Sequence, residues 1–119
     1  MNILVASPTP DALTGFLDGL VAAGHVVHVV PTAAEAIKAV TETPPGLCVV
    51  DAGLPDMEPF KLVARLMQIN ALVFTAVVSD LSEADFHEAG EGLGILLHLP
   101  PGPGLADATK LCEALAAVS

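Results

Sequence analysis

The stretch Gly46-Leu47-Cys48-Val49-Val50-Asp51-Ala52-Gly53-Leu54-Pro55-Asp56-Met57-Glu58-Pro59 decides the fold class of this 119-residue chain. A wholly apolar run ends in the carboxylate of Asp51, and a loop rich in glycine and proline then leads into a helical pattern. A strand that is apolar on both faces is typical of a parallel sheet covered by helices on both sides. Functional sites of such sheets lie outside the carboxyl ends of the strands, so Asp51 stands at the predicted position of a site.

Strand and helix patterns alternate along the whole chain. Strands are predicted at residues 3–6, 25–30, 46–51, 71–78 and 95–97, and helices at residues 10–23, from 32 through 40, from 59 through 66, at 82–89 and from 105 through 115. Gly24 has the position of a helix-ending glycine, Thr32 to Glu35 has capping-box spacing, and Pro59 suits a first helical residue. Such alternation predicts right-handed crossovers and a parallel sheet. We predict one doubly wound α/β domain over residues 1–119.

The composition argues against several classes of partner. A hydrophobic content of 53% with 15% charged residues is typical of a globular protein. The formal net charge of −10 argues against binding to nucleic acid or to an anionic membrane. The chain has no secretory leader pattern and no apolar run of membrane-spanning length, and Cys48 and Cys112 lie within apolar patterns as expected for free thiols. We therefore expect a cytoplasmic protein.

Several side chains converge at the predicted carboxyl edge of the sheet: Ser7, Pro8, Asp51, Ser79, His98 and Leu99. The chain resembles the receiver domain of bacterial response regulators in Asp51 and the apolar strand before it, in Leu54-Pro55 and Met57, in the hydroxyl at the end of the fourth strand (Ser79), and in Pro100 after the fifth strand. The resemblance covers essentially the whole chain. It implies a CheY-like, flavodoxin-like sheet with the strand order 2-1-3-4-5.

The resemblance also assigns roles to single residues. In this family an aspartate at the position of Asp51 accepts a phosphoryl group from a histidine kinase, so Asp51 is the candidate phospho-acceptor. Ser79 matches the hydroxyl that contacts the phosphoryl group, with Thr75 as a second candidate. Pro100 matches a proline that follows a cis peptide bond. The face made by the fourth helix, the fifth strand and the fifth helix is where family members meet partners or form homodimers.

Four positions depart from the family pattern. Ser7 and Pro8 replace the acidic pair that helps to hold Mg²⁺, Leu99 replaces a lysine, and Leu96 stands at the aromatic switch position. Mg²⁺ requires oxygen ligands, usually including carboxylates, and phosphoryl transfer depends on neutralised charge. We therefore predict a degenerate receiver, or pseudo-receiver, which is not an enzyme, has no cofactor and binds Mg²⁺ weakly at most through Asp51.

Other interpretations of these residues stay open at this point. Asp11, Asp56 or Glu58 could restore a metal site, and a phosphorylatable Asp51 is the alternative function. Ser79 is also well placed as a helix N-cap, with Asp80 beside it. A flavin site is disfavoured because the two prolines of residues 7–10 remove backbone N–H donors from the phosphate loop.

The predicted partner is another protein, either a histidine kinase or a signalling or output protein. The expected binding face carries Leu96 and His98 as well as four acidic residues, Glu83, Asp85, Glu88 and Glu91. An acidic face favours a basic partner surface and binding that weakens as salt rises. The four histidines show no metal-ligand spacing, so packing is their expected role.

Overall fold

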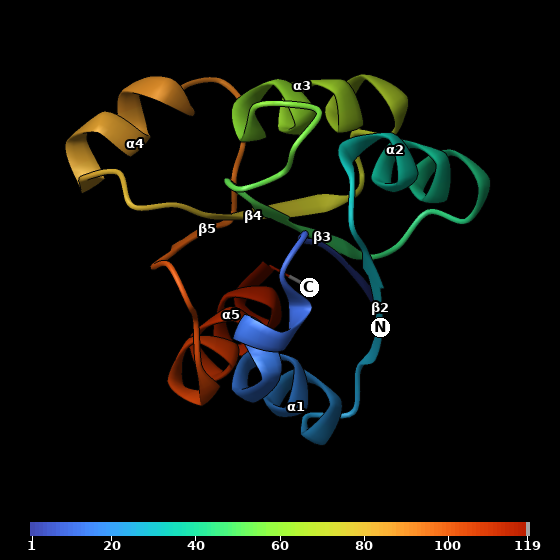
Figure 1. Ribbon diagram of the computed structural model, residues 1–119, viewed down its shortest axis with the longest axis vertical. Coiled ribbons are helices and arrows are strands. Elements are labelled where there is room, and N and C mark those ends of the chain that lie inside the picture. The colour runs from blue at the N-terminus through green and yellow to red at the C-terminus, as the bar shows by residue number, and fades with distance from the viewer. Residues whose placement is uncertain (119) are drawn as a thin grey trace.

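Five parallel strands form one sheet at the centre of the fold, as a computed structural model describes it for residues 1–118 (Figure 1). The strands are β1 (Asn2–Ala6), β2 (Val26–Val30), β3 (Leu47–Asp51), β4 (Phe74–Val78) and β5 (Leu97–Leu99). Their order across the sheet is β2-β1-β3-β4-β5, and every neighbouring pair is parallel. The predicted doubly wound topology and strand order are confirmed.

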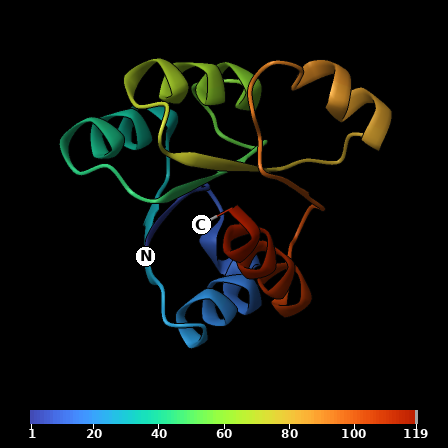
Figure 2. The same ribbon diagram turned by 180° about the vertical axis from the view of Figure 1, so that it is seen from behind.

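Helices cover both faces of this sheet (Figures 1 and 2). The helices are α1 (Thr14–Ala22), α2 (Ala33–Glu42), α3 (Pro59–Ile69), α4 (Glu83–Ala89) and α5 (Leu105–Val118). Helices α2, α3 and α4 lie on one face, and α1 and α5 lie side by side on the other.

Strand β3 separates two apolar cores, because its successive side chains point to opposite faces. Leu47 and Val49 belong to the core beneath α1 and α5, whereas Cys48 and Val50 belong to the core beneath α2, α3 and α4. All four side chains are fully buried. The apolar run before Asp51 is therefore buried on both sides, as its sequence predicts.

Local signals in the sequence set most helix ends. Thr32 caps α2 by accepting a hydrogen bond from the Glu35 amide at 3.2 Å, and Pro59 opens α3. Gly24, which follows α1, has a φ of +93°, a conformation that glycine adopts without strain. The prediction of one helix over residues 10–23 is wrong at its start, because residues 10–13 form a 3₁₀ turn before α1 begins.

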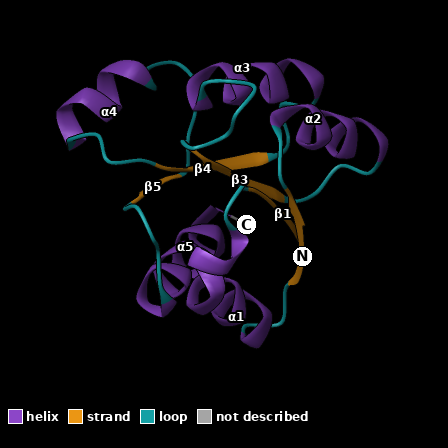
Figure 3. Ribbon diagram, viewed as in Figure 1, coloured by secondary structure: helices purple, strands orange, loops and turns teal. Residues whose placement is uncertain are grey.

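The bounds of β4 and β5 differ from the prediction by more than one residue. Strand β4 begins at Phe74 rather than residue 71, because the Asn70 side chain and carbonyl accept hydrogen bonds from the Leu72 and Val73 amides and hold a turn there. Strand β5 begins at Leu97 and ends at Leu99, two residues later than predicted for both ends. The long loop before it contains Gly92 and Gly94 in left-handed conformations and delays the strand (Figure 3).

Both cysteines are free thiols, as predicted, with Cys48 buried and Cys112 half-buried. Burial raises the pKa of the Cys48 thiol to about 12, so it remains a neutral part of the core. Within residues 1–118, none of the helices combines the length and apolar character needed to cross a membrane.

The contact between α1 and α5 depends on Gly19. A Cβ atom there would lie 2.8 Å from Ala108 Cβ and 2.9 Å from Leu105 Cδ1, so the two helices would have to move apart. We expect Gly19→Ala to destabilise the fold by about 1–3 kcal/mol in urea unfolding. Gly15→Ala is the matched control, because its Cβ would find no atom closer than 3.8 Å. Equal stability of the two variants would contradict this packing.

Candidate functional site at the carboxyl edge of the sheet

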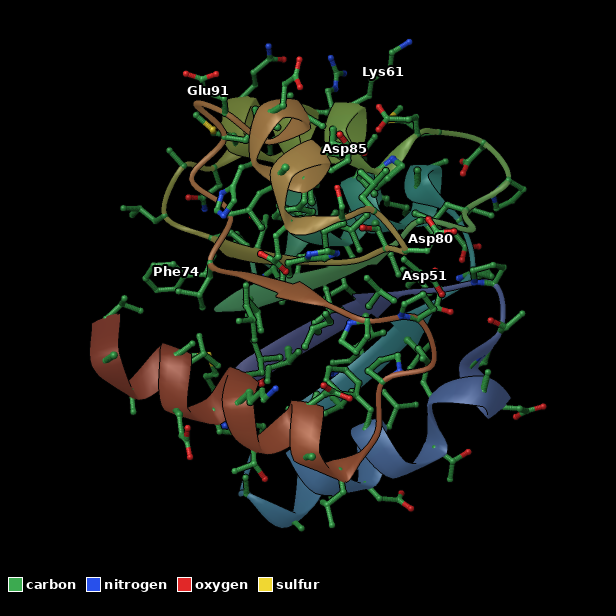
Figure 4. All side chains as sticks on the ribbon, turned by 90° about the vertical axis from the view of Figure 1, so that its left-hand side faces the viewer. Asp51, Lys61, Phe74, Asp80, Asp85 and Glu91 are labelled. Carbon is green, nitrogen blue, oxygen red and sulfur yellow. The ribbon has the colours of Figure 1, made fainter. Side chains whose placement is uncertain are left out.

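Three adjacent strand ends bring the predicted site residues together. Asp51 is the last residue of β3, Ser7 follows β1, and Ser79 follows β4. The register pairs Asp51 with Val78, so Ser79 comes directly after its neighbour on β4. Figure 4 shows Asp51 and Asp80 at the same edge of the sheet. The convergence of Ser7, Asp51 and Ser79 is as the sequence predicts.

The Asp51 carboxylate receives hydrogen bonds on both oxygen atoms. The Ser7 hydroxyl donates to Oδ2 at 2.8 Å, and the Gly53 amide donates to Oδ1 at 3.1 Å. Ser7 is fully buried, and its oxygen also accepts a hydrogen bond from the Thr9 amide at 3.2 Å. The amide of Thr9 thus orients the hydroxyl whose proton points to Asp51.

A cleft of about 380 Å³ opens beside Asp51. It is lined by Thr9, Ala12, Leu13, Asp51, Ala52, Gly53, Val78, Ser79, Asp80, Pro101 and Gly102. Two of these residues are acidic and none is basic. Leu99 has no charge and no hydrogen-bond donor in its side chain, which is 1% exposed and packs in the core with α1 and α5. The cleft is therefore a region of negative charge.

Ser79 forms a hydrogen-bonded chain with residues of β5 and α4. Its hydroxyl lies 2.8 Å from His98 Nε2, and His98 Nδ1 lies 3.1 Å from Glu83 Oε1. His98 Nε2 is also 3.1 Å from the Ser79 carbonyl oxygen. The His98 ring stacks on Phe86 at a centroid distance of 3.9 Å and an interplanar angle of 6°. This chain links the edge of the cleft to the first turns of α4.

The structure corrects two predictions at this edge. Ser79 is not the N-cap of α4, because Ser82 has that role and accepts a hydrogen bond from the Asp85 amide at 3.1 Å. The peptide bond before Pro100 is trans, not cis. A trans bond is the lower-energy form before proline by about 0.5–1 kcal/mol.

The carboxylates that could have restored a metal site have other positions. Asp56 accepts hydrogen bonds from the Ala33 and Ala34 amides at the start of α2, at 2.8 and 3.0 Å. Glu58 caps α3 through the amides of Phe60 and Lys61. Neither these two carboxylates nor Asp11 lines the cleft beside Asp51.

Mg²⁺, which the receiver resemblance implies, fits this set of donors poorly. The ion needs near-octahedral oxygen ligands, usually with one or two carboxylates and freely available lone pairs. Here Ser7 presents its proton to Asp51 and Pro8 has no side-chain oxygen. Within residues 1–118, no three or more His, Cys, Asp or Glu residues are grouped so that they could hold a metal ion.

The sequence alone did not identify the contact of His98 with Ser79 and Glu83. With β5 at its true boundaries, His98 pairs with Val77 and lies next to the residue that follows β4. Sequence patterns place both Ser79 and His98 at this edge, but a side-chain contact between two strand ends has no local sequence signal. Leu96, the predicted switch position, lies outside β5 and is half-buried against the core beneath α1 and α5. The ring that contacts Ser79 belongs to His98 instead.

The fold, but not the sequence, has recognisable relatives. No protein-family model and no curated protein matches the sequence. A CheY-like response regulator receiver domain protein from Methanospirillum hungatei JF-1 superimposes with a TM-score of 0.84 at 20% identity, covering 98% of this chain and 94% of that one. A two-component response regulator from Clostridium difficile gives 0.85 at 15% identity, with 100% and 98% covered.

A sensor protein from Polaromonas sp. JS666 has the same fold, with a TM-score of 0.83 at 22% identity, covering 99% of this chain and 98% of that one. These similarities establish that the chain has the fold of CheY-like receiver domains. At identities of 15–22% they show the fold alone and not the chemistry of the site.

Asp56 provides a test of the loop that follows Asp51. Hydrogen bonds from the Ala33 and Ala34 amides hold the pKa of the Asp56 carboxyl below its ordinary value of 3.8. A carboxyl group whose pKa is lower in the folded than in the unfolded chain stabilises the fold fully at any pH above its unfolded-state pKa. This stabilisation is lost as the pH falls through its folded-state pKa. We expect the difference in unfolding free energy between the native chain and Asp56→Asn to be constant at neutral pH and to shrink below about pH 3.8. A difference that does not change with pH would contradict this role.

Proposed function

We propose that this chain is a degenerate receiver domain that signals by binding another protein, with impaired Mg²⁺-dependent phosphorylation of Asp51. On this proposal it is a cytoplasmic binding protein of a two-component pathway and not an enzyme. Its partner is a histidine kinase or a signalling or output protein. The fold shared with CheY-like receivers supports the general class, and the chemistry of the cleft supports the finer statement.

The single observation that carries the proposal is the charge of the cleft. A phosphoryl group on Asp51 would carry about −1.5 to −2 charges, in place of the single charge of the carboxylate, beside Asp80 in a cleft lined by no lysine or arginine. Phosphoryl transfer relies on cations that neutralise the equatorial oxygens. The carboxylate that would have to attack is also held by the Ser7 hydroxyl and the Gly53 amide. Both features work against transfer to Asp51.

The proposed binding face is centred on α4. Glu83, Asp85, Glu88 and Glu91 are exposed there, and Asp85 and Glu91 lie on the outer side of the helix and its following loop in Figure 4. The His98 chain fixes the first turn of this helix to the end of β4. An acidic surface of this kind favours a partner with a basic surface.

Phosphorylation is tested by incubating the native chain and an Asp51→Asn variant with acetyl phosphate and Mg²⁺, followed by intact-mass analysis. We expect no stable phosphorylated species in either protein, because the cleft supplies no neutralising charge. Stoichiometric labelling of the native chain alone would establish the alternative function, a response regulator that accepts phosphate on Asp51.

Partner binding is tested by comparing charge-reversal variants on the two helical layers. We expect Glu88→Lys to weaken capture of partner proteins several-fold, while Asp51→Asn leaves the capture unchanged. Asp18→Lys on α1 is the matched control, because it makes the same change in net charge on the opposite face of the sheet. Equal losses in Glu88→Lys and Asp18→Lys would contradict the assignment of this face.

A further inference from the structure

The two open edges of the sheet are protected to different degrees. Strand β5 is three residues long and is followed by Pro100 and Pro101, which shortens and blocks that edge. Strand β2 has five residues in unbroken register with β1, from Asn2↔Val26 to Ala6↔Val30. It contains no proline, no lysine and no acidic residue. Edge strands without such protection are templates for pairing with another strand.

Exposed apolar side chains gather at this edge. Within residues 1–118, eight large hydrophobic side chains are exposed, and four of them lie on β2 or beside it: Met1, Val21, Val26 and Val29. Val26 is 53% exposed and Val29 is 38% exposed. The Met1 carbonyl accepts a hydrogen bond from the Val26 amide, which holds Met1 beside β2. Val21 lies in the last turn of α1, the helix that precedes β2. In a chain of net charge −10, these four side chains form an apolar cluster at the sheet edge.

The backbone of β2 has free hydrogen-bonding capacity at two alternate residues. The Val26 amide donates to Met1 and the Val30 carbonyl accepts from Ser7, so residues 26, 28 and 30 direct their backbone groups to β1. Residues of a strand alternate in this respect. Val27 and Val29 therefore direct their N–H and C=O groups to the open side.

We propose that two copies of this chain pair through β2, in antiparallel register about a two-fold axis at His28. Val27 of one copy then exchanges two hydrogen bonds with Val29 of the other, and the symmetric pair adds two more. Centring the axis on His28 pairs all five residues, whereas centring it on Val27 or Val29 leaves part of the strand unpaired. The sequence Val-Val-His-Val-Val is a palindrome, so every pair across the axis is Val–Val except His28 with itself. Pairs of β-branched residues stabilise such ladders.

The surface beside β2 has room for the partner's side chains. A groove of about 450 Å³ runs between β2 and the end of α2, and His28, Val30, Glu42 and Thr43 are among its lining residues. In the proposed register Val26 of one copy lies opposite Val30 of the other and on the same face of the joined sheet. The exposed Val26 side chain of each copy would therefore enter the groove of the other copy.

The pairing is closed, and it is distinct from the partner face on α4. Each chain has one unprotected edge, and a two-fold contact uses that edge on both copies, so growth stops at a dimer. The two copies carry the same negative charge, so salt should strengthen this association by screening their repulsion. Binding of a basic partner to α4 should weaken with salt, which separates the two surfaces experimentally.

The register is tested by single cysteine substitutions in a Cys112→Ser background. In an antiparallel pair without mutual hydrogen bonds, directly opposite Cα atoms lie about 4.5 Å apart, within the range that a disulfide spans. We expect His28→Cys to form a disulfide-linked dimer with oxidised glutathione. Val26→Cys is the matched control, because Val26 faces Val30 of the other copy rather than itself. Absence of the His28→Cys dimer, or equal linking of both variants, would overturn the proposal.

The backbone contact is tested by sedimentation of the whole chain over a range of protein and salt concentrations. We expect a monomer–dimer equilibrium without larger species, and a dimer dissociation constant that falls as salt rises. Val29→Pro removes the outward amide but no bond to β1, so the dissociation constant should rise by about tenfold to a hundredfold. Val29→Thr keeps the amide and should change the dissociation constant little.

Thermal unfolding of both Val29 variants shows whether the fold is retained. If Val29→Pro is unfolded, His28→Asp replaces it, because it places two like charges opposite each other at an exposed position and should raise the dissociation constant several-fold. A native chain that stays monomeric at high protein and salt concentration, or that forms open-ended polymers, would overturn the proposal.

Discussion

The hydrogen bond from the Ser7 hydroxyl to Asp51 Oδ2 defines the chemistry of this edge of the sheet. It lies where three neighbouring strands end, and it links the ends of β1 and β3. Ser7 is fully buried and accepts the Thr9 amide, so its proton has a fixed direction. A carboxylate that is satisfied by a neighbouring hydroxyl and by the Gly53 amide can remain at this edge without a metal ion. The fold is thus compatible with Ser7 and Pro8 at the two positions that follow β1.

Other residues near the cleft also have structural contacts that account for their positions. Leu99 is at the position where the receiver resemblance implies a lysine, and its side chain is buried in the core beneath α1 and α5. Asp56 and Glu58 serve the starts of α2 and α3. His98 connects the end of β4 to α4 through Ser79, Glu83 and a stacked Phe86. These contacts are the basis for proposing a binding surface rather than a site of phosphoryl transfer.

Much of the fold could be predicted because its signals are local. The two-sided apolar run of β3, the Thr32 cap and Pro59 at a helix start each depend on a few neighbouring residues. The errors arose where distant or irregular contacts decide the structure. Loop glycines delayed β5, and the turn at Asn70 delayed β4. The hydrogen bond between His98 and Ser79 joins side chains 19 residues apart, so no local pattern predicts it. The cis bond before Pro100 was expected from the family pattern alone, and the bond is trans.

The affinity for Mg²⁺ tests the central claim most directly, because the proposed replacement of an acidic pair by Ser7 and Pro8 acts on cation binding. Backbone amide shifts of Asp51, Ala52 and Gly53 can be followed by NMR while MgCl₂ is added. A Ser7→Asp/Pro8→Asp variant serves as the reference with a restored acidic pair. We predict that the native chain shows no saturation in the low millimolar range, whereas the variant binds more tightly. Saturation of the native chain at low millimolar Mg²⁺ would contradict the account.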